Sequence, residues 1–180
     1  MGRKKKTVAQ IKAAAKAAAK RMTLGKTNKM LGAAVGAIDA ALISVQAGDY
    51  SSLPRRLVQN YSGVNINDGT VKLENAAKGL GAPIFNKLER AIFKGLNVPA
   101  PSLKRKGLSS KIGVGVYYGA SIANAAGGSD NLDKFRRYVH SQYGVDLTQD
   151  GTAVLDYSKP IFEKVIPYIA VTKLMSWAMK

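Results

Sequence analysis

Residues 30–45, MLGAAVGAIDAALISV, set the fold class of this chain. Almost all of them are small or apolar, and alanine and leucine are among the best helix formers. Gly32 and Gly36 are four residues apart, so they lie on one face of a helix, where the missing side chains let a second helix approach closely. Asp39 lies in the middle and makes a membrane span costly. The segment predicts a helix that packs tightly against other helices.

A similar composition returns in residues 112–126, IGVGVYYGASIANAA, where Gly115 and Gly119 form a second pair at helical spacing. We expect all four glycines, Gly32, Gly36, Gly115 and Gly119, to be sites of close helix packing. Apolar residues recur at helical spacing in three further segments, namely residues 74–96, 132–143 and 152–180. The chain therefore contains enough helical segments for a bundle.

Prolines and capping residues modify these three helices. Pro83 is expected to kink or split the first of them, because proline lacks an amide hydrogen and clashes with the preceding turn. Pro160 and Pro167 are expected to bend the last one. Asp130 is expected to open the second helix, and Gly144 to close it, since acidic residues favour helix starts and glycine favours helix ends.

Two other segments are rich in turn residues. Residues 67–69, NDG, are typical of a tight turn, which would join short extended pieces at residues 64–66 and 70–73. Residues 98–107, VPAPSLKRKG, contain two prolines and a basic triplet and predict an extended linker. That linker is the best internal boundary of the chain.

The fold class expected from these patterns is mainly α. We predict a compact bundle of about five to seven short helices with glycine- and alanine-lined packing and one small β-hairpin. Residues 1–29 are expected to form a basic helical arm, and residues 30–180 a helical body. A chain of 180 residues with 46% hydrophobic residues is large enough to bury a core of this kind.

Positive charge is concentrated at the start of the chain. The first acidic residue is Asp39, and the formal net charge of the whole chain is +17. Ten basic residues precede Asp39: Arg3, Lys4, Lys5, Lys6, Lys12, Lys16, Lys20, Arg21, Lys26 and Lys29. Lysines and arginines bind nucleic acid by replacing the counterions of its phosphates, without reading bases. The block therefore predicts nucleic acid as the partner.

The sequence of the arm adds a resemblance to known proteins. Residues 13–20, AAAKAAAK, place lysines at every fourth position of a helix expected over residues 7–22. This pattern resembles the tails of linker histones and other packaging proteins. The arm together with a glycine- and alanine-rich helical body also resembles small virion structural proteins, including helical nucleocapsid subunits. The resemblance implies a non-enzymatic, self-associating protein of a virion, nucleoid or nucleus that packages nucleic acid.

Two further basic clusters are candidates for phosphate contacts, namely Arg55 with Arg56 and the triplet Lys104, Arg105 and Lys106. Residues 130–163 hold six acids, so we expect the positive surface to lie elsewhere. The eight tyrosines are scattered and lack the arrangement of a single-strand-binding domain. Duplex binding through phosphates, independent of sequence, is therefore the favoured mode.

Several enzyme and metal classes are disfavoured by the sequence. The chain has no cysteine, and His140 is its single histidine, so the usual thiolate and imidazole sites cannot form. Residues 113–119, GVGVYYG, have the spacing GxGxxxG and not the dinucleotide fingerprint GxGxxG. We expect no catalytic residue, no metal and no cofactor.

A membrane-associated protein is the alternative interpretation. Residues 30–45, residues 112–126 and the C-terminal IPYIAVTKLMSWAMK offer apolar faces beside lysines that favour anionic headgroups. Trp177, close to the C-terminus, suits a membrane interface. The chain would then be an internal structural protein of a lipid-containing virus particle or a peripheral membrane protein. Lysines interrupt the alanine-rich start every four residues, so a secretory signal peptide is not expected.

Overall fold

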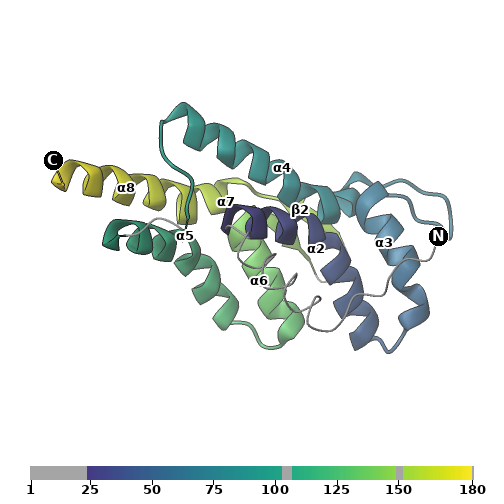
Figure 1. Ribbon diagram of the computed structural model, residues 1–180. Coiled ribbons are helices and arrows are strands. Elements are labelled where there is room, and N and C mark those ends of the chain that lie inside the picture. The colour runs from purple at the N-terminus through teal and green to yellow at the C-terminus, as the bar shows by residue number, and fades with distance from the viewer. Residues whose placement is uncertain (1–23, 103–106, 149–151, 180) are drawn as a thin grey trace, which may run out of the picture.

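The computed structural model describes residues 24–102, 107–148 and 152–179, and within them the chain is mainly α (Figure 1). The longer helices are α2 (Leu24–Gln46), α3 (Leu53–Ser62), α4 (Leu73–Gly95), α5 (Leu108–Ala126), α6 (Asn131–Tyr143) and α8 (Ile166–Ala178). Short helical turns are η1 (Tyr50–Ser52), α7 (Ser158–Pro160) and the π-helical turn η2 (Ile161–Val165). Strands β1 (Val145–Leu147) and β2 (Ala153–Leu155) form an antiparallel hairpin. The predicted fold class is confirmed, while the helix expected over residues 7–22 lies outside the described residues.

The first glycine pair lies where α2 meets α4. A Cβ atom on Gly36 would lie 2.9 Å from the Cα of Gly79, and one on Gly32 would lie 2.5 Å from the side-chain nitrogen of Asn86. Tyr61 of α3 fixes the same helix, because its hydroxyl donates a hydrogen bond to the carbonyl oxygen of Ala33 at 2.6 Å. The second pair, Gly115 and Gly119, has open space at both Cβ positions. Only the first pair therefore supports packing between helices of one chain.

Replacing Gly36 by alanine tests this packing. The added methyl group meets backbone, so we expect a loss of about 1–3 kcal/mol in the free energy of unfolding. The matched control is Gly115→Ala, where the new side chain meets open space and helix propensity should add about 0.5–1 kcal/mol. Urea denaturation of both variants measures the two effects. Equal stabilities would contradict this account of the α2–α4 contact.

The ends of α6 follow the sequence. Asp130 precedes its first turn and accepts hydrogen bonds from the amides of Leu132 and Asp133 at 2.8 and 2.9 Å. Gly144 ends the helix with a left-handed φ of 69°. Both predicted boundary residues are confirmed.

Prolines and turn residues predicted the structure less accurately than the capping residues of α6 did. α4 runs through Pro83 as one helix and is not split, and α2 packs against it both before the proline, at Gly79, and after it, at Asn86. The hairpin lies at β1 and β2, and β2 falls at the start of residues 152–180, which were expected to be helical. At the predicted hairpin only one bridge forms, between Val64 and Val71, although Gly69 does adopt the positive φ of a tight turn. Short strands depend on packing against neighbours more than on turn residues.

The expected linker is partly anchored to the body. Val98 is buried in the core, Pro101 is also buried, and the hydroxyl of Tyr168 donates a hydrogen bond to the carbonyl oxygen of Pro99. Residues 98–102 therefore pack against the helical core. The basic triplet of the linker lies outside the described residues.

A charged pair lies at the centre of the helices. Lys164 on η2 is fully buried, and its Nζ lies 2.9 Å from Oε1 of Glu89 on α4. The same Nζ donates to the carbonyl oxygen of Gln142 at 2.7 Å, and the Tyr117 hydroxyl donates to the Glu89 carboxylate at 2.6 Å. Burial lowers the pKa of Lys164 to about 8, although the nearby Glu89 opposes this shift. The pair ties α4, α5, α6 and η2 together.

Asn28, near the start of α2, extends this polar centre. Its side-chain amide donates to Asn86 on α4 at 3.1 Å and accepts from Tyr143 and Gln142 on α6 at 2.8 and 3.2 Å. Burial raises the pKa of Tyr143 far above its ordinary value, so its hydroxyl stays a hydrogen-bond donor. The beginning of α2 is therefore an integral part of the body.

Candidate nucleic-acid interface

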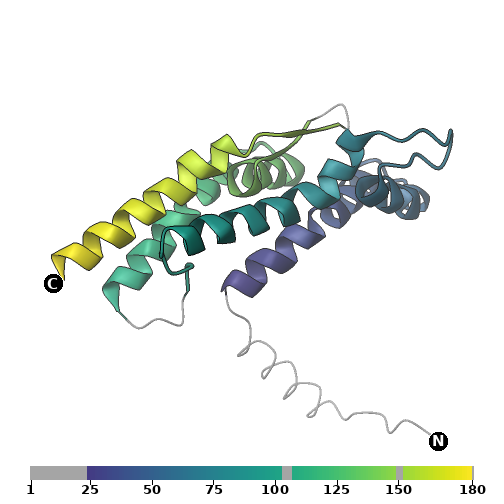
Figure 2. The same cartoon turned by 90° about the horizontal axis from the view of Figure 1, so that it is seen from above.

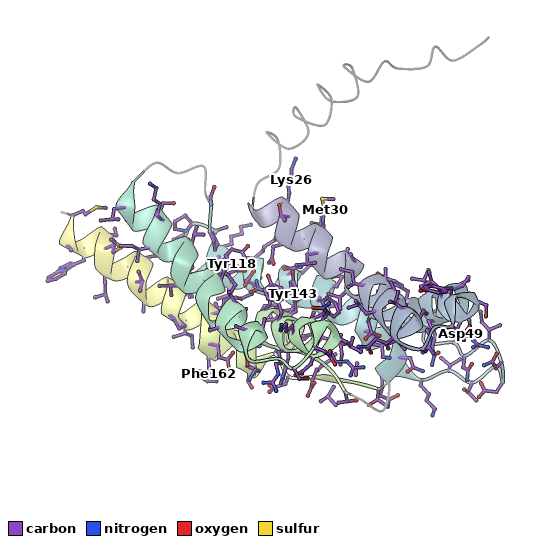
Figure 3. All side chains as sticks on the ribbon, turned by 90° about the horizontal axis from the view of Figure 1, so that it is seen from below. Lys26, Met30, Asp49, Tyr118, Tyr143 and Phe162 are labelled. Atoms are coloured by element: carbon purple, nitrogen blue, oxygen red, sulfur yellow. The ribbon has the colours of Figure 1, made fainter. Side chains whose placement is uncertain are left out.

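The predicted phosphate-binding residues fall into described and undescribed groups. Eleven of them lie outside the described residues: Arg3, Lys4, Lys5, Lys6, Lys12, Lys16, Lys20, Arg21, Lys104, Arg105 and Lys106. Lys26 and Lys29 are exposed on the first turns of α2, where Lys26 and the neighbouring Met30 point away from the body (Figure 3). Arg55 is exposed and Arg56 half-buried on α3. The described members thus lie on two separate helices.

Arg56 lies at a groove that the sequence did not indicate. The groove has a volume of about 770 Å³ and is lined by residues of α2, α3, α6 and β1. Its basic residues are Arg56, Arg136, Arg137 and His140. Arg136 and His140 are four residues apart on α6, so helical geometry places them on the same side of that helix. α3 and α6, which are far apart in the sequence, therefore supply three arginines and a histidine to one groove.

Acidic residues also line the groove, but two of them are already engaged. Asp133 forms an ion pair with Arg137 at 3.1 Å, and Asp130 caps the amides of α6. The hydrogen bonds from Ser129 and Arg137 hold the pKa of Asp133 below its ordinary value. Asp146 is the third acid, on β1. Because Asp130 occupies the start of α6, an anion in the groove would be held by side chains and not by the amides of that helix.

Arg56 and Arg136 are the residues best placed to bind an anion. The Nε of Arg136 is buried and has no hydrogen-bond partner. A buried donor without a partner costs free energy. Arg136 lines the groove, where the outer nitrogens of its guanidinium group could bind an anion. Arg56 uses its Nε to donate to the hydroxyl of Ser52 at 3.0 Å, which fixes the direction of its guanidinium group. Arginine favours phosphate because its donors match two oxygens at once.

A buried lysine lies close enough to these arginines for their charge to shift its pKa. Lys78 on α4 pairs with Asp39 of α2 at 3.6 Å, and Asn60 donates to the same carboxylate at 3.2 Å. The pKa of Lys78 is lowered, first by burial and further by repulsion from Arg136 and Arg56, while Asp39 opposes the shift. Arg136 and Arg56 therefore lie close enough to Lys78 to act on its charge, which Asp39 neutralises.

Sequence reasoning missed Arg136, Arg137 and His140. It grouped them with the acids of residues 130–163 and placed the positive surface elsewhere. The acids at the start of α6 are used in capping and pairing, which a count of charges along the chain does not record. The spacing of Arg136 and His140 was the available signal.

A second basic surface lies on the last turns of α4. Lys87, Arg90 and Lys94 are all exposed there at helical spacing. Arg90 also lines a small cavity of about 40 Å³ together with Asn28, so it lies near the start of α2. The dense basic block of the sequence comes directly before α2, and Arg90 adds a positive charge near the start of that helix.

Two general tests of the site concern membranes and metals. Residues Lys26–Gln46 form a helix long and apolar enough to cross a membrane, and 39% of its most apolar window is buried in the fold. In the part of the chain that the structure describes, no group of three or more His, Cys, Asp or Glu side chains could hold a metal ion.

Comparison with protein-family models, curated proteins and solved structures found no match to this chain.

Proposed function

We propose that this chain is a non-enzymatic structural protein that binds duplex nucleic acid through its phosphates and associates with further copies of itself. The observation that carries the proposal is the groove that Arg56 and Arg136 line together, although they come from different helices. The net charge of +17 and the basic block before Asp39 supply the long-range attraction. Packaging of nucleic acid, in a virion or a nucleoid, is the role that these features fit best.

Binding independent of base sequence follows from the kind of groups present. The groove offers arginine side chains and a histidine, which suit phosphate oxygens. Contacts of this kind hold the backbone of a duplex and carry no base information. Affinity should therefore depend on salt and on the number of phosphates covered.

Self-association is supported by features that the single chain leaves uncovered. Gly115 and Gly119 have open space at their Cβ positions, so another helix can approach α5 there. An apolar hollow of about 420 Å³ lies beside Gly115 and includes Leu31, Tyr118 and Ile122 among its lining residues. The lining of this hollow shares no residue with the groove of Arg136.

Neutralising Arg136 tests the role of the groove. For Arg136→Gln we expect the slope of log affinity against log salt to become shallower by about 1, because one phosphate contact is lost. The matched control is Arg137→Gln on the same helix, which removes the same charge from a side chain already paired with Asp133. Fluorescence anisotropy with a labelled duplex gives both slopes. Equal slopes for the two variants would exclude the groove as a phosphate site.

A further inference from the structure

One end of the molecule is built from the start of α5 and the end of α8, which run antiparallel. A Cβ atom on Gly113 would lie 3.1 Å from the ring of Tyr168, and Ser109 and Met179 line one hollow of about 310 Å³. Both views place the start of α5 and the C-terminus at the same end (Figures 1 and 2). We call this end the α5–α8 tip, defined by residues 108–112 and 173–179.

Large apolar side chains are exposed at the α5–α8 tip. Leu108 is 72% exposed, Leu174 is 63% exposed and Trp177 is 78% exposed. Ile112 and Met179 are exposed beside them. Large apolar side chains that are exposed at one end of a molecule commonly mark an interaction site.

The two helices of the tip carry charges of one sign. Neither α5 nor α8 contains an aspartate or a glutamate, and their only charged residues, Lys111 and Lys173, are both exposed. In the sequence, Lys104, Arg105 and Lys106 come directly before Gly107, and Lys180 ends the chain. Within the described residues of α5 and α8, the apolar side chains of the tip are thus accompanied by lysines alone.

The apolar side chains and the lysines together indicate which kind of partner could cover the tip. A second copy of the tip would bring lysine against lysine, and nucleic acid has no apolar surface for Leu108, Leu174 and Trp177. An anionic lipid surface offers both complements, since acyl chains accept the apolar side chains and the headgroups attract the lysines. Tryptophan at the end of a helix is typical of the boundary between lipid and water.

We propose that the α5–α8 tip inserts into the interface of an anionic lipid surface. Leu108, Leu174 and Trp177 enter the boundary between headgroups and acyl chains, while Lys111 and Lys173 contact lipid phosphates. The groove of Arg136 lies near the other end of α5, because Ser129 and Asp130, which line it, come shortly after that helix ends at Ala126. α5 has 19 residues, which span about 28 Å. The chain can therefore hold nucleic acid at one end and lipid at the other.

The tryptophan content of the chain allows a direct test, because Trp177 is the only tryptophan. The full-length protein is mixed with vesicles of phosphatidylcholine and phosphatidylglycerol in equal amounts, and in parallel with vesicles of phosphatidylcholine alone. With the anionic vesicles we expect the emission of Trp177 to shift to the blue and its quenching by acrylamide to fall. With the neutral vesicles both changes should be much smaller.

A pair of variants separates insertion from simple adsorption. Leu174→Ser is expected to weaken partitioning into the anionic vesicles by roughly tenfold, because an apolar side chain is lost from the lipid. The control is Leu73→Ser at the start of α4, an exposed leucine outside the tip, which should leave partitioning unchanged. Equal losses for both variants would overturn the proposal.

Two other results would also overturn it. Flotation with anionic vesicles without any change in Trp177 emission would mean that basic residues adsorb while the tip stays in water. A blue shift that grows with protein concentration in the absence of vesicles would assign the tip to a second copy. Neither result would affect duplex binding by the groove, so this proposal and the proposed function can fail separately.

Discussion

Replacing Lys164 by methionine is expected to lower the free energy of unfolding by roughly 3–5 kcal/mol, the usual cost of leaving one member of a buried ion pair without its partner. Glu89 is only 5% exposed, and in the variant the Tyr117 hydroxyl would be its remaining hydrogen-bond donor. Urea denaturation of the variant and the parent at neutral pH measures the loss.

A matched control lies five residues earlier in the chain. Lys159 pairs with Glu163 at 3.1 Å on a partly exposed helix surface, so Lys159→Met should change stability by less than about 1 kcal/mol. The double variant Lys164→Met, Glu89→Gln should lose at least about 0.5 kcal/mol less than the sum of the two single losses, because the two side chains interact directly. A loss below about 1 kcal/mol for Lys164→Met would show that the buried pair does not hold the helices together.

Neutralising the leading basic block should have the largest effect on binding. Eight lysines and arginines precede Leu24, namely Arg3, Lys4, Lys5, Lys6, Lys12, Lys16, Lys20 and Arg21. Changing all eight to glutamine removes up to eight phosphate contacts, so affinity for duplex DNA at low salt should fall at least roughly a hundredfold. Anisotropy titrations of the parent and the variant at equal salt measure this loss.

The variant has to keep the body intact for this comparison to hold. Changes that stop before Leu24 spare Asn28, whose hydrogen bonds join α2 to α4 and α6, whereas a deletion through Lys29 would remove it. Circular dichroism and the unfolding midpoint of the glutamine variant should therefore match those of the parent. An unchanged affinity would show that the leading block is not a nucleic-acid contact.

The fold could be predicted where local chemistry decides structure. Asp130 and Gly144 bound α6 because capping depends on the residues next to the helix, and Gly36 packs closely because nothing larger fits. Elsewhere the contacts with neighbouring helices determine the structure, and the local sequence does not record those contacts. Gly115 has the same spacing as Gly36 but faces open space, since neighbouring helices and not spacing determine what a glycine contacts.

The candidate site was predictable only in part, for a related reason. Arg56 was identified from its position in a basic cluster, but its partner Arg136 comes from a helix eighty residues later in the chain. The pairing of Lys164 with Glu89 was equally hidden, because Lys164 reads as an ordinary surface lysine in the sequence. The groove and the buried ion pair both depend on contacts between helices that are far apart in the sequence, and no local sequence pattern indicates such contacts.

The most direct test of the central claim is the salt dependence of duplex binding by the full-length chain, measured for two unrelated DNA sequences. If basic side chains neutralise about eight phosphates or more, log affinity should fall with log salt at a slope of about −7 or steeper. The two sequences should give the same slope and nearly equal affinities. A slope shallower than about −2, or a tenfold difference in affinity between the two sequences, would contradict a protein that holds nucleic acid by its phosphates.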